Sequence, residues 1–353
     1  MADRIAVVLF QLGGPDSTEA VEPFLYNLFM DPDIIDFPLA FLARKPLARF
    51  ISRKRSVKVA ENYRLIGGKS PILDLTRRQS DALERRLRES GMDATTFIAM
   101  RYWHPFTKTV VREIRNGGFT RIILLPLYPQ FSRATTLSSM NEWDRECERQ
   151  GLRIPTQYVC CYPAGEGYVG ALVENINALL ERFRGVDPAS IDLLFSAHGV
   201  PVSYIAKGDP YQMQMEYTVR QVMAAGGWTS PHRLCFQSRV GPMKWLQPSL
   251  VETVHQLAAT GRKNLAVIPV AFVTDHIETL HEINIDVRRE AMALGVERFE
   301  LMPALNDHPK YVDGLAGLVT DLVRGEDPVR TCSLLWGADT DRPRLRLCPR
   351  IPR

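Results

Sequence analysis

The chain has 353 residues, of which 45% are hydrophobic and 24% charged, so it is long enough for two or three compact domains of ordinary globular composition. Its 44 basic and 40 acidic side chains leave a net charge of +4, which is too small to indicate nucleic-acid binding. No apolar run reaches the roughly 20 residues that span a bilayer, and no leader peptide precedes the first apolar run, so we expect a cytoplasmic protein. We also expect a monomer, because no self-complementary apolar patch is visible in the sequence.

Apolar runs typical of strands buried on both faces alternate along the chain with polar segments of helical period. The expected strands are residues 5–12, 95–100, 121–128, 191–197, 233–238 and 264–273. The expected helices are residues 77–89, 110–115, 170–183, 213–224, 249–259 and 279–294. This alternation predicts an α/β fold with parallel sheets.

A basic segment lies between the first and second predicted strands, within residues 34–58. Its cations are Arg44, Lys45, Arg49, Arg53, Lys54, Arg55 and Lys58, and the apolar residues before them include Phe37, Leu39, Phe41 and Leu42. The segment is either a solvated helix face or a lip that rests on anionic lipid, with the apolar side chains dipping into the membrane. Pro38 and Pro46 argue against one long helix here.

The two halves of the chain share a pattern. Residues 118–126 (GFTRIILLP) align with residues 261–269 (GRKNLAVIP) at a constant offset of 143. Two similar open α/β units would place the ends of all six strands at carboxyl edges, where parallel sheets bind ligands. We therefore expect a functional cleft between the units.

The apolar run at residues 191–197 stops at a histidine between small residues, in the stretch LLFSAHGVP. Ser196, Ala197 and Gly199 leave His198 little steric shielding, so we expect its imidazole to project from the end of the strand. A core histidine bonded to the backbone is the alternative interpretation.

An acidic ladder follows the last predicted strand, in FVTDHIETLHEINIDV (272–287). Glu278, Glu282 and Asp286 follow one another at spacings of four, which stacks three carboxylates on one face of an α-helix. Such like-charged neighbours destabilise a helix, so the ladder needs a reason, although solvated surface acids are the alternative. One imidazole and a row of carboxylates favour a divalent cation that is held weakly and handed on.

The sequence resembles the ferrochelatase family, whose members insert ferrous iron into a porphyrin. The matching motifs cover nearly the whole chain: LGGP (12–15), FLYNLFMDPDII, YRLIGGKSPI, MRYWHPFT, PLYPQFSRATTLSS, SAHGVP, FQSRVGPMKWLQP, PVAFVTDHIETLHEI and PALND (303–307). The resemblance implies two Rossmann-like domains, at residues 1–165 and 166–325, around a porphyrin cleft. In the tail, residues 326–353, we place no motif of the family.

The resemblance also assigns site residues. His198 matches the histidine held to accept pyrrole protons, to ligate iron, or both, and Glu278 matches the glutamate paired with it across the cleft. A neutral imidazole with an ordinary pKa near ~6.5 would be a suitable acceptor. With these two, Glu282 and Asp286 match the acidic line proposed to lead metal inward. The implied porphyrin-binding residues are Leu12, Tyr63, Ser70, Arg101, Tyr102, Gln130, Ser132, Thr135, Trp245 and Phe272. Of these, Arg101 and Tyr102 match the wall that a rival proposal makes the first metal contact, whereas Trp245 and Phe272 could equally be core aromatics.

No cofactor beyond the substrate Fe²⁺ is expected. Some members carry a 2Fe–2S cluster on cysteines, but the tail offers only Cys332 and Cys348, and Arg133 stands where one branch has its interior cysteine. Cys160 or Cys161 could supply interior ligands, so the cysteine count disfavours a cluster without excluding it.

The predicted activity is the insertion of Fe²⁺ into protoporphyrin IX with release of two protons, which yields protohaem. The alternatives are a chelatase for another metal or porphyrin, such as cobalt or coproporphyrin, and a non-catalytic tetrapyrrole or metal carrier.

Overall fold

The computed structural model describes residues 3–34, 40–238 and 243–325, and the side chains of residues 40–42 lie outside this description. The described chain forms two compact units. One contains residues 3–161 and 315–325, and the other contains residues 162–314. The predicted domain boundaries after residues 165 and 325 stay predictions, and the expectations for Phe37, Leu39 and the tail fall outside the described residues.

The first unit is built on a parallel sheet with strand order β2-β1-β3-β4. Its strands are β1 (Ile5–Gln11), β2 (Ala94–Met100), β3 (Arg121–Pro126) and β4 (Thr156–Tyr158). The central strand β1 is buried along its whole length, as its continuous apolar run predicts. The sequence reading missed β4, because three half-buried residues carry too short a pattern to indicate a strand.

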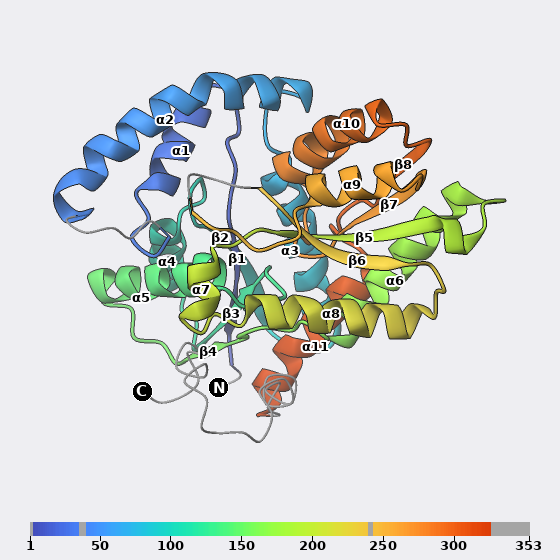
Figure 1. Cartoon of the computed structure of the whole chain (residues 1–353). Helices are drawn as coiled ribbons and strands as arrows, with labels where there is room; N and C mark the ends of the chain where they lie inside the picture. The colour runs from blue at the N-terminus through green and yellow to red at the C-terminus, as the bar shows by residue number, and fades with distance from the viewer. Residues whose placement is uncertain (1–2, 35–39, 239–242, 326–353) are drawn as a thin grey trace. The chain divides into compact units, whose positions relative to one another are not determined.

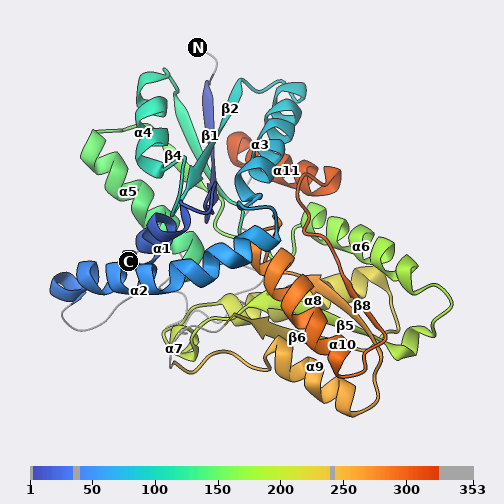
Figure 2. The same ribbon diagram turned by 90° about the horizontal axis from the view of Figure 1, so that it is seen from above.

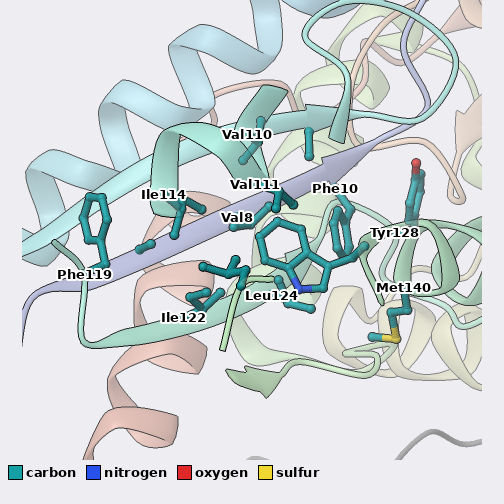
Figure 3. Packing of buried hydrophobic residues seen from close by; sticks show 14 residues of the cluster. Val8, Phe10, Val110, Val111, Ile114, Phe119, Ile122, Leu124, Tyr128 and Met140 are labelled. Atoms are coloured by element: carbon teal, nitrogen blue, oxygen red, sulfur yellow. The ribbon is translucent and has the colours of Figure 1, made fainter. Parts of the chain in front are cut away.

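Helices cover both faces of this sheet. The helices of this unit are α1 (Val21–Phe29), α2 (Ala40–Leu65), α3 (Ile72–Glu89), α4 (Thr107–Asn116), α5 (Ser138–Gln150) and the C-terminal part of α11 (Pro309–Arg324), with a π-helical turn η1 (Arg133–Leu137) before α5. Figure 2 shows α4 and α5 on one face of the sheet and α3 and α11 on the other. Under α4 and α5 the core joins Phe10, Val110, Val111 and Trp143 (Figure 3).

The prediction that proline would prevent one long helix in the basic segment is wrong. Helix α2 runs from Ala40 to Leu65 with Pro46 inside it. Because a proline removes one hydrogen bond and crowds the residue four positions before it, Pro46, the seventh residue of α2, disturbs only the N-terminal part of the helix and leaves the rest intact. Among the helices that the structure describes, none is long and apolar enough to cross a membrane.

The second unit repeats the plan. Its strands β5 (Ile191–His198), β6 (His232–Gln237), β7 (Asn264–Pro269) and β8 (Arg298–Leu301) form a parallel sheet of order β6-β5-β7-β8. Its helices are α6 (Glu166–Leu180), α7 (Val202–Ala206), α8 (Tyr211–Gly226), α9 (Leu250–Ala259) and α10 (Arg288–Ala293), with the π-helix η4 (Glu278–Val287) before α10 and short 3-10 turns η2 (Glu181–Phe183) and η3 (Pro188–Ser190). Figure 1 shows α9 and α10 on one face of the sheet and α6 and α8 on the other.

The two-domain α/β fold with parallel sheets is confirmed, and strand register extends the internal repeat. Ile5 pairs with Arg121 and Ile191 with Asn264, and Arg121 and Asn264 are 143 residues apart. In the same register Leu12 takes the position of His198. The repeat also explains why β3 and β7 end earlier than predicted. Each stops at a proline, which has no N–H to donate to the next ladder position.

Candidate active site

His198 is the last residue of β5, at the carboxyl end of the central strand of its unit. The next residue must be glycine, since a Cβ on Gly199 would lie 2.8 Å from the Gln237 carbonyl oxygen and 3.3 Å from the Trp245 ring. The His198 side chain is 37% exposed and bonds a carboxylate, so it is not a core histidine bonded to the backbone.

The imidazole is held by Glu278, the first residue of the π-helix η4. His198 Nδ1 lies 2.8 Å from Glu278 Oε2. Because an ionised carboxylate can only accept, Nδ1 carries the proton of this bond and Nε2 carries the lone pair of the neutral ring. The expectation that the two groups face one another across a cleft is wrong, because they belong to one unit and bond directly.

Further polar groups surround the same carboxylate oxygen. Gln237 Nε2 lies 3.4 Å from Glu278 Oε2, and the Gln237 amide is oriented by Ser196, whose hydroxyl donates to Oε1 at 2.6 Å. His276 Nε2 lies 3.8 Å from Glu278 Oε2, while its Nδ1 donates to the Thr274 carbonyl at 3.0 Å. These contacts hold Glu278 in one position, and through it they fix the orientation of the imidazole.

The pair shifts the pKa of both its members. Burial disfavours imidazolium, but the charge and the hydrogen bond of Glu278 outweigh burial, so the pKa of His198 is raised above its ordinary value of 6.5. Burial also disfavours carboxylate, yet the charge and hydrogen bond of His198 and the contact with His276 outweigh it, and the pKa of Glu278 is lowered. The expectation of an unperturbed imidazole is therefore wrong. His198 is a stronger base than a free histidine.

The acidic ladder is only partly assembled. Glu282 faces the end of β6, as Glu278 does, where the Ser238 backbone N–H and hydroxyl donate to its two oxygens at 2.9 and 2.7 Å. Burial, and after it the Glu278 charge, raises the pKa of Glu282. Asp286 has different partners, with Oδ2 lying 3.2 Å from His281 Nδ1 and Oδ1 lying 2.8 Å from Arg289 Nη2.

The helix that carries the ladder also differs from the prediction. Residues 278–287 form a π-helix, with hydrogen bonds between residues five apart, and only residues 288–293 are α-helical. The sequence could not distinguish the two, because three of the four buried residues, Thr279, Ile283 and Val287, repeat every four positions, a spacing that both helix types place near one face.

The two predicted aromatic contacts of the second unit have different environments. The Phe272 ring is partly exposed and packs edge-on against His198, with 6.0 Å between ring centroids, so it is not a plain core residue. Trp245 is 8% exposed and forms a β-bridge with Pro201.

Arg101 and Tyr102 follow β2 in the first unit and meet a buried carboxylate. Asp31 accepts from Arg101 Nη2 at 3.0 Å and from the Tyr102 hydroxyl at 2.6 Å, and the Ser138 hydroxyl donates to it at 2.5 Å. Arg101 Nε also donates to Ser138 at 2.8 Å. Burial and the Asp31 charge raise the pKa of Tyr102 well above its ordinary value, so this hydroxyl stays protonated. The four residues form one hydrogen-bonded network.

The other predicted porphyrin contacts also lie in the first unit. Leu12 and Thr135 are partly exposed, whereas Tyr63, Ser70, Gln130 and Ser132 are buried. Ser70 packs against Gly14, where a Cβ would lie 2.5 Å from the serine oxygen, and Ser132 caps η1 by accepting from the Ala134 N–H. Their porphyrin contacts stay predictions.

Sequence reasoning missed Asp31, Ser138, Gln237 and Ser238. Gln237 and Ser238 lie at the end of a predicted strand, the position that singled out His198, so polarity at that position could have found them. The signal for Asp31 is weaker, since it is one of two acids in MDPDII and only the fold brings it to Arg101.

Among the residues that the structure describes, no group of three or more His, Cys, Asp or Glu side chains is arranged to hold a metal ion. Cys147 is partly buried and Cys160, Cys161 and Cys235 are buried, whereas Cys332 lies outside the described residues, as does Cys348. The expectation that the cysteine count disfavours a 2Fe–2S cluster therefore stays a prediction.

Comparison with solved structures shows similar folds. Two structures of the chelatase SirB from Bacillus subtilis, one with Fe³⁺ and one of subspecies spizizenii in complex with cobalt, each superpose with a TM-score of 0.51. They are 13% and 12% identical in sequence and are covered over 95% and 96% of their lengths, with 90% and 91% of this chain matched. At this identity the similarity supports the two-unit fold alone.

Sequence comparison is more specific. Ferrochelatase of Cyanothece sp. is 44% identical over 91% of this chain and 83% of its own length, and that of Geotalea uraniireducens is 47% identical over 92% of this chain and 100% of its own length. The model of the ferrochelatase family matches residues 4–322. The chain therefore belongs to the ferrochelatase family, the lyases that insert a metal ion into a porphyrin.

Proposed function

We propose that this protein inserts Fe²⁺ into protoporphyrin IX, with His198 as the group that accepts a pyrrole proton. The observation that carries the proposal is the 2.8 Å bond between His198 Nδ1 and Glu278 Oε2 at the carboxyl end of β5. It directs the Nε2 lone pair away from the carboxylate, and so toward a bound substrate.

The proton steps follow from this arrangement. The two inner N–H protons of the porphyrin leave as the dication enters, and His198 Nε2 takes one of them while water takes the other. The proton stays on the imidazole, because the lowered pKa of Glu278 disfavours transfer to the carboxylate. Glu278 stabilises the imidazolium by its charge, and a base so positioned contributes about 10²- to 10⁴-fold to the rate.

The metal would approach along the carboxylates. Fe²⁺ takes imidazole nitrogen and carboxylate oxygen, and in this site His198, Glu278 and Glu282 offer these atoms, with Asp286 one step further along the helix. Two nearby carboxylates and one imidazole bind a dication more weakly than a complete cage does. A weak site suits a metal that must move on to the porphyrin.

The porphyrin itself is a flat apolar disc, for which partly exposed apolar side chains are sufficient walls. Phe272 beside His198 has this character, and so has Leu12 at the matching strand end of the first unit. We propose that both contact the ring. The polar atoms of Arg101 and Tyr102 are engaged by Asp31 and Ser138. We therefore propose that these two residues shape the porphyrin site through the network that they form.

The test is an anaerobic assay that follows the Soret band after Fe²⁺ and protoporphyrin IX are mixed with purified protein. We expect insertion by the wild-type chain and a loss of at least 10²-fold in His198→Ala. The matched control is His255→Ala, because His255 also pairs with a carboxylate, Glu290, but lies on the exposed faces of α9 and α10. Equal rates in the His198 and His255 variants would contradict the proposal. Faster insertion into coproporphyrin would reassign the substrate.

We also propose that α2 rests on an anionic membrane surface. Within Ala40–Leu65 the only acid is Glu61, against the seven cations of the basic segment and Arg64 further along the helix. Phe50 and Val57 are each 66% exposed and lie seven residues apart, on one side of the helix. Exposed apolar side chains flanked by cations are typical of helices that lie in the headgroup region.

Sedimentation with lipid vesicles tests this contact. We expect binding to vesicles that contain phosphatidylglycerol and not to vesicles of phosphatidylcholine alone. Lys54→Glu should weaken the free energy of binding by about 1 kcal/mol or more. Phe50→Ser should weaken binding, whereas Met292→Ser, which changes an exposed apolar residue of the second unit, should not. Equal binding to the two kinds of vesicle would contradict the proposal.

A further inference from the structure

Ser238 has an unusual backbone. It directly follows β6, and its φ of 63° lies in the left-handed region, which among the described non-glycine residues only Asn306 shares. A serine in this region is strained, and such strain persists where the surroundings impose it, often at functional sites.

The strained conformation allows two donors to reach one carboxylate. The backbone N–H of Ser238 donates to Glu282 Oε1 at 2.9 Å, and its hydroxyl donates to Oε2 at 2.7 Å. Both oxygens of Glu282 are therefore engaged by a single residue. The contacts of Glu278 are distributed differently, since His198, Gln237 and His276 all approach its Oε2.

This difference matters for a cation. A divalent ion binds carboxylate oxygen lone pairs, and each of the two hydrogen bonds occupies one lone pair of Glu282, draws charge from its oxygens and fixes the orientation of the carboxylate. The donors and the metal compete for the same oxygens. Ser238 is thus placed to set how readily Glu282 takes a metal.

We infer that Ser238 is a positioning residue that gates Glu282. The two hydrogen bonds from Ser238 hold the Glu282 carboxylate away from the metal until they break. The inference rests on the proposed function, because it presumes that a divalent ion passes Glu282. In the gated state His198 and Glu278 are the available ligands. Release of Glu282 by Ser238 adds a further carboxylate, so the gate would tune metal affinity without touching the proton acceptor.

The direct test measures metal binding rather than turnover. Co²⁺ is titrated into the full-length protein without porphyrin, and its visible absorption bands report ligation. Ser238→Ala removes the competing hydroxyl and should lower the Kd for Co²⁺ about tenfold. Ser238→Gly also removes the hydroxyl but fits a φ of 63° without strain, so it should give the same shift if the hydroxyl matters and the strain does not.

Two further variants show whether the effect acts through Glu282. In a Glu282→Gln background, Ser238→Ala should leave the Kd unchanged, because the competing carboxylate is gone. Thr18→Ala is the matched control, since the Thr18 hydroxyl donates to the Glu19 carboxylate at 2.8 Å on the surface of the first unit, and it should have no effect.

The outcome separates this inference from the proposed function. If the wild-type chain inserts iron, His198→Ala does not, and neither Ser238 variant tightens Co²⁺ binding, the gate is wrong and the proposed function stands. A tightening that persists in the Glu282→Gln background would also overturn the gate. If the gate is present, the Ser238 variants should in addition lower the KM for Fe²⁺ while the KM for porphyrin stays unchanged.

Discussion

The carboxyl ends of the two sheets occupy the same place in the repeated fold but carry different chemistry. Leu12 ends the central strand region of one unit where His198 ends that of the other. The repeat at an offset of 143 continues past β3 and β7, so that Thr135, in ATTL, takes the position of Glu278, in IETL. The buried threonines that follow, Thr136 and Thr279, are equivalent as well.

This comparison shows what the repeated architecture does and does not supply. In both units it supplies a central parallel strand, a π-helical segment after β3 or β7, and a polar residue after the edge strand β2 or β6. Among the described residues, a histidine paired with a glutamate at the end of a central strand is present only in the second unit. In the first, the corresponding edge holds Arg101 and Tyr102 in a buried network with Asp31. We therefore expect the charged residues near the strand ends to take part in the reaction in the second unit and to stabilise the fold in the first.

The largest effect should come from His198→Ala. Loss of the proton acceptor should lower kcat for iron insertion by about 10²- to 10⁴-fold, with little change in stability, since the side chain is 37% exposed. The matched variant in the first unit is Leu12→Ala, which should raise the KM for porphyrin and leave kcat nearly unchanged. Single-turnover and steady-state rates measure both. A comparable fall in kcat in the two variants would show that both units, and not the second alone, contribute to the chemical step.

The reverse result is expected for Asp31→Ala. It leaves the guanidinium of Arg101, which is only 10% exposed, without its buried counter-charge, and breaking such a pair costs about 3–5 kcal/mol. Urea denaturation gives the free energy of unfolding. Tyr102→Phe, which removes one hydrogen bond and no charge, should cost less. If Asp31→Ala unfolds at the wild-type midpoint, the network does not stabilise the first unit.

Glu278→Gln should change the pH dependence of the reaction. His198 must be neutral to accept a proton, so activity should rise with pH through the raised pKa of His198, above 6.5. Without the Glu278 charge, burial remains as the main influence and lowers that pKa, so the acidic limb should move to lower pH. The rate at the optimum should fall by about 10- to 100-fold, because the imidazole loses its orientation. A limb that does not move would exclude His198 as the titrating group.

The two units also differ in how far their sequences reveal them. The six long strands and the repeat were predictable, because strands buried on both faces leave continuous apolar runs. The edge strands β4 and β8 were not, at three and four residues. The Pro46 prediction failed because the cost of one lost hydrogen bond was set against the whole of α2 instead of its N-terminal part.

The candidate site was predictable where a single residue stands out at a strand end, as His198 does. The partners of that residue were harder to find, since a hydrogen bond such as that of Ser238 to Glu282 joins residues 44 positions apart and depends on one left-handed φ. The pKa of His198 could not be read from the sequence either, because it depends on the distance to Glu278.

The smallest effect, and the sharpest check on the repeat, is expected for Thr135→Val. Thr135 holds the position of Glu278, but its hydroxyl cannot orient a base, and its counterpart at the strand end is the apolar Leu12. If it contacts porphyrin, as the family resemblance implies, the variant loses one hydrogen bond worth about 0.5–1.5 kcal/mol, and the KM for porphyrin should rise by about 2- to 10-fold. The pH profile and kcat should stay as in the wild type. A fall in kcat of the size expected for Glu278→Gln would mean that the first unit contributes to the chemical step, and the division between the two strand edges would have to be abandoned.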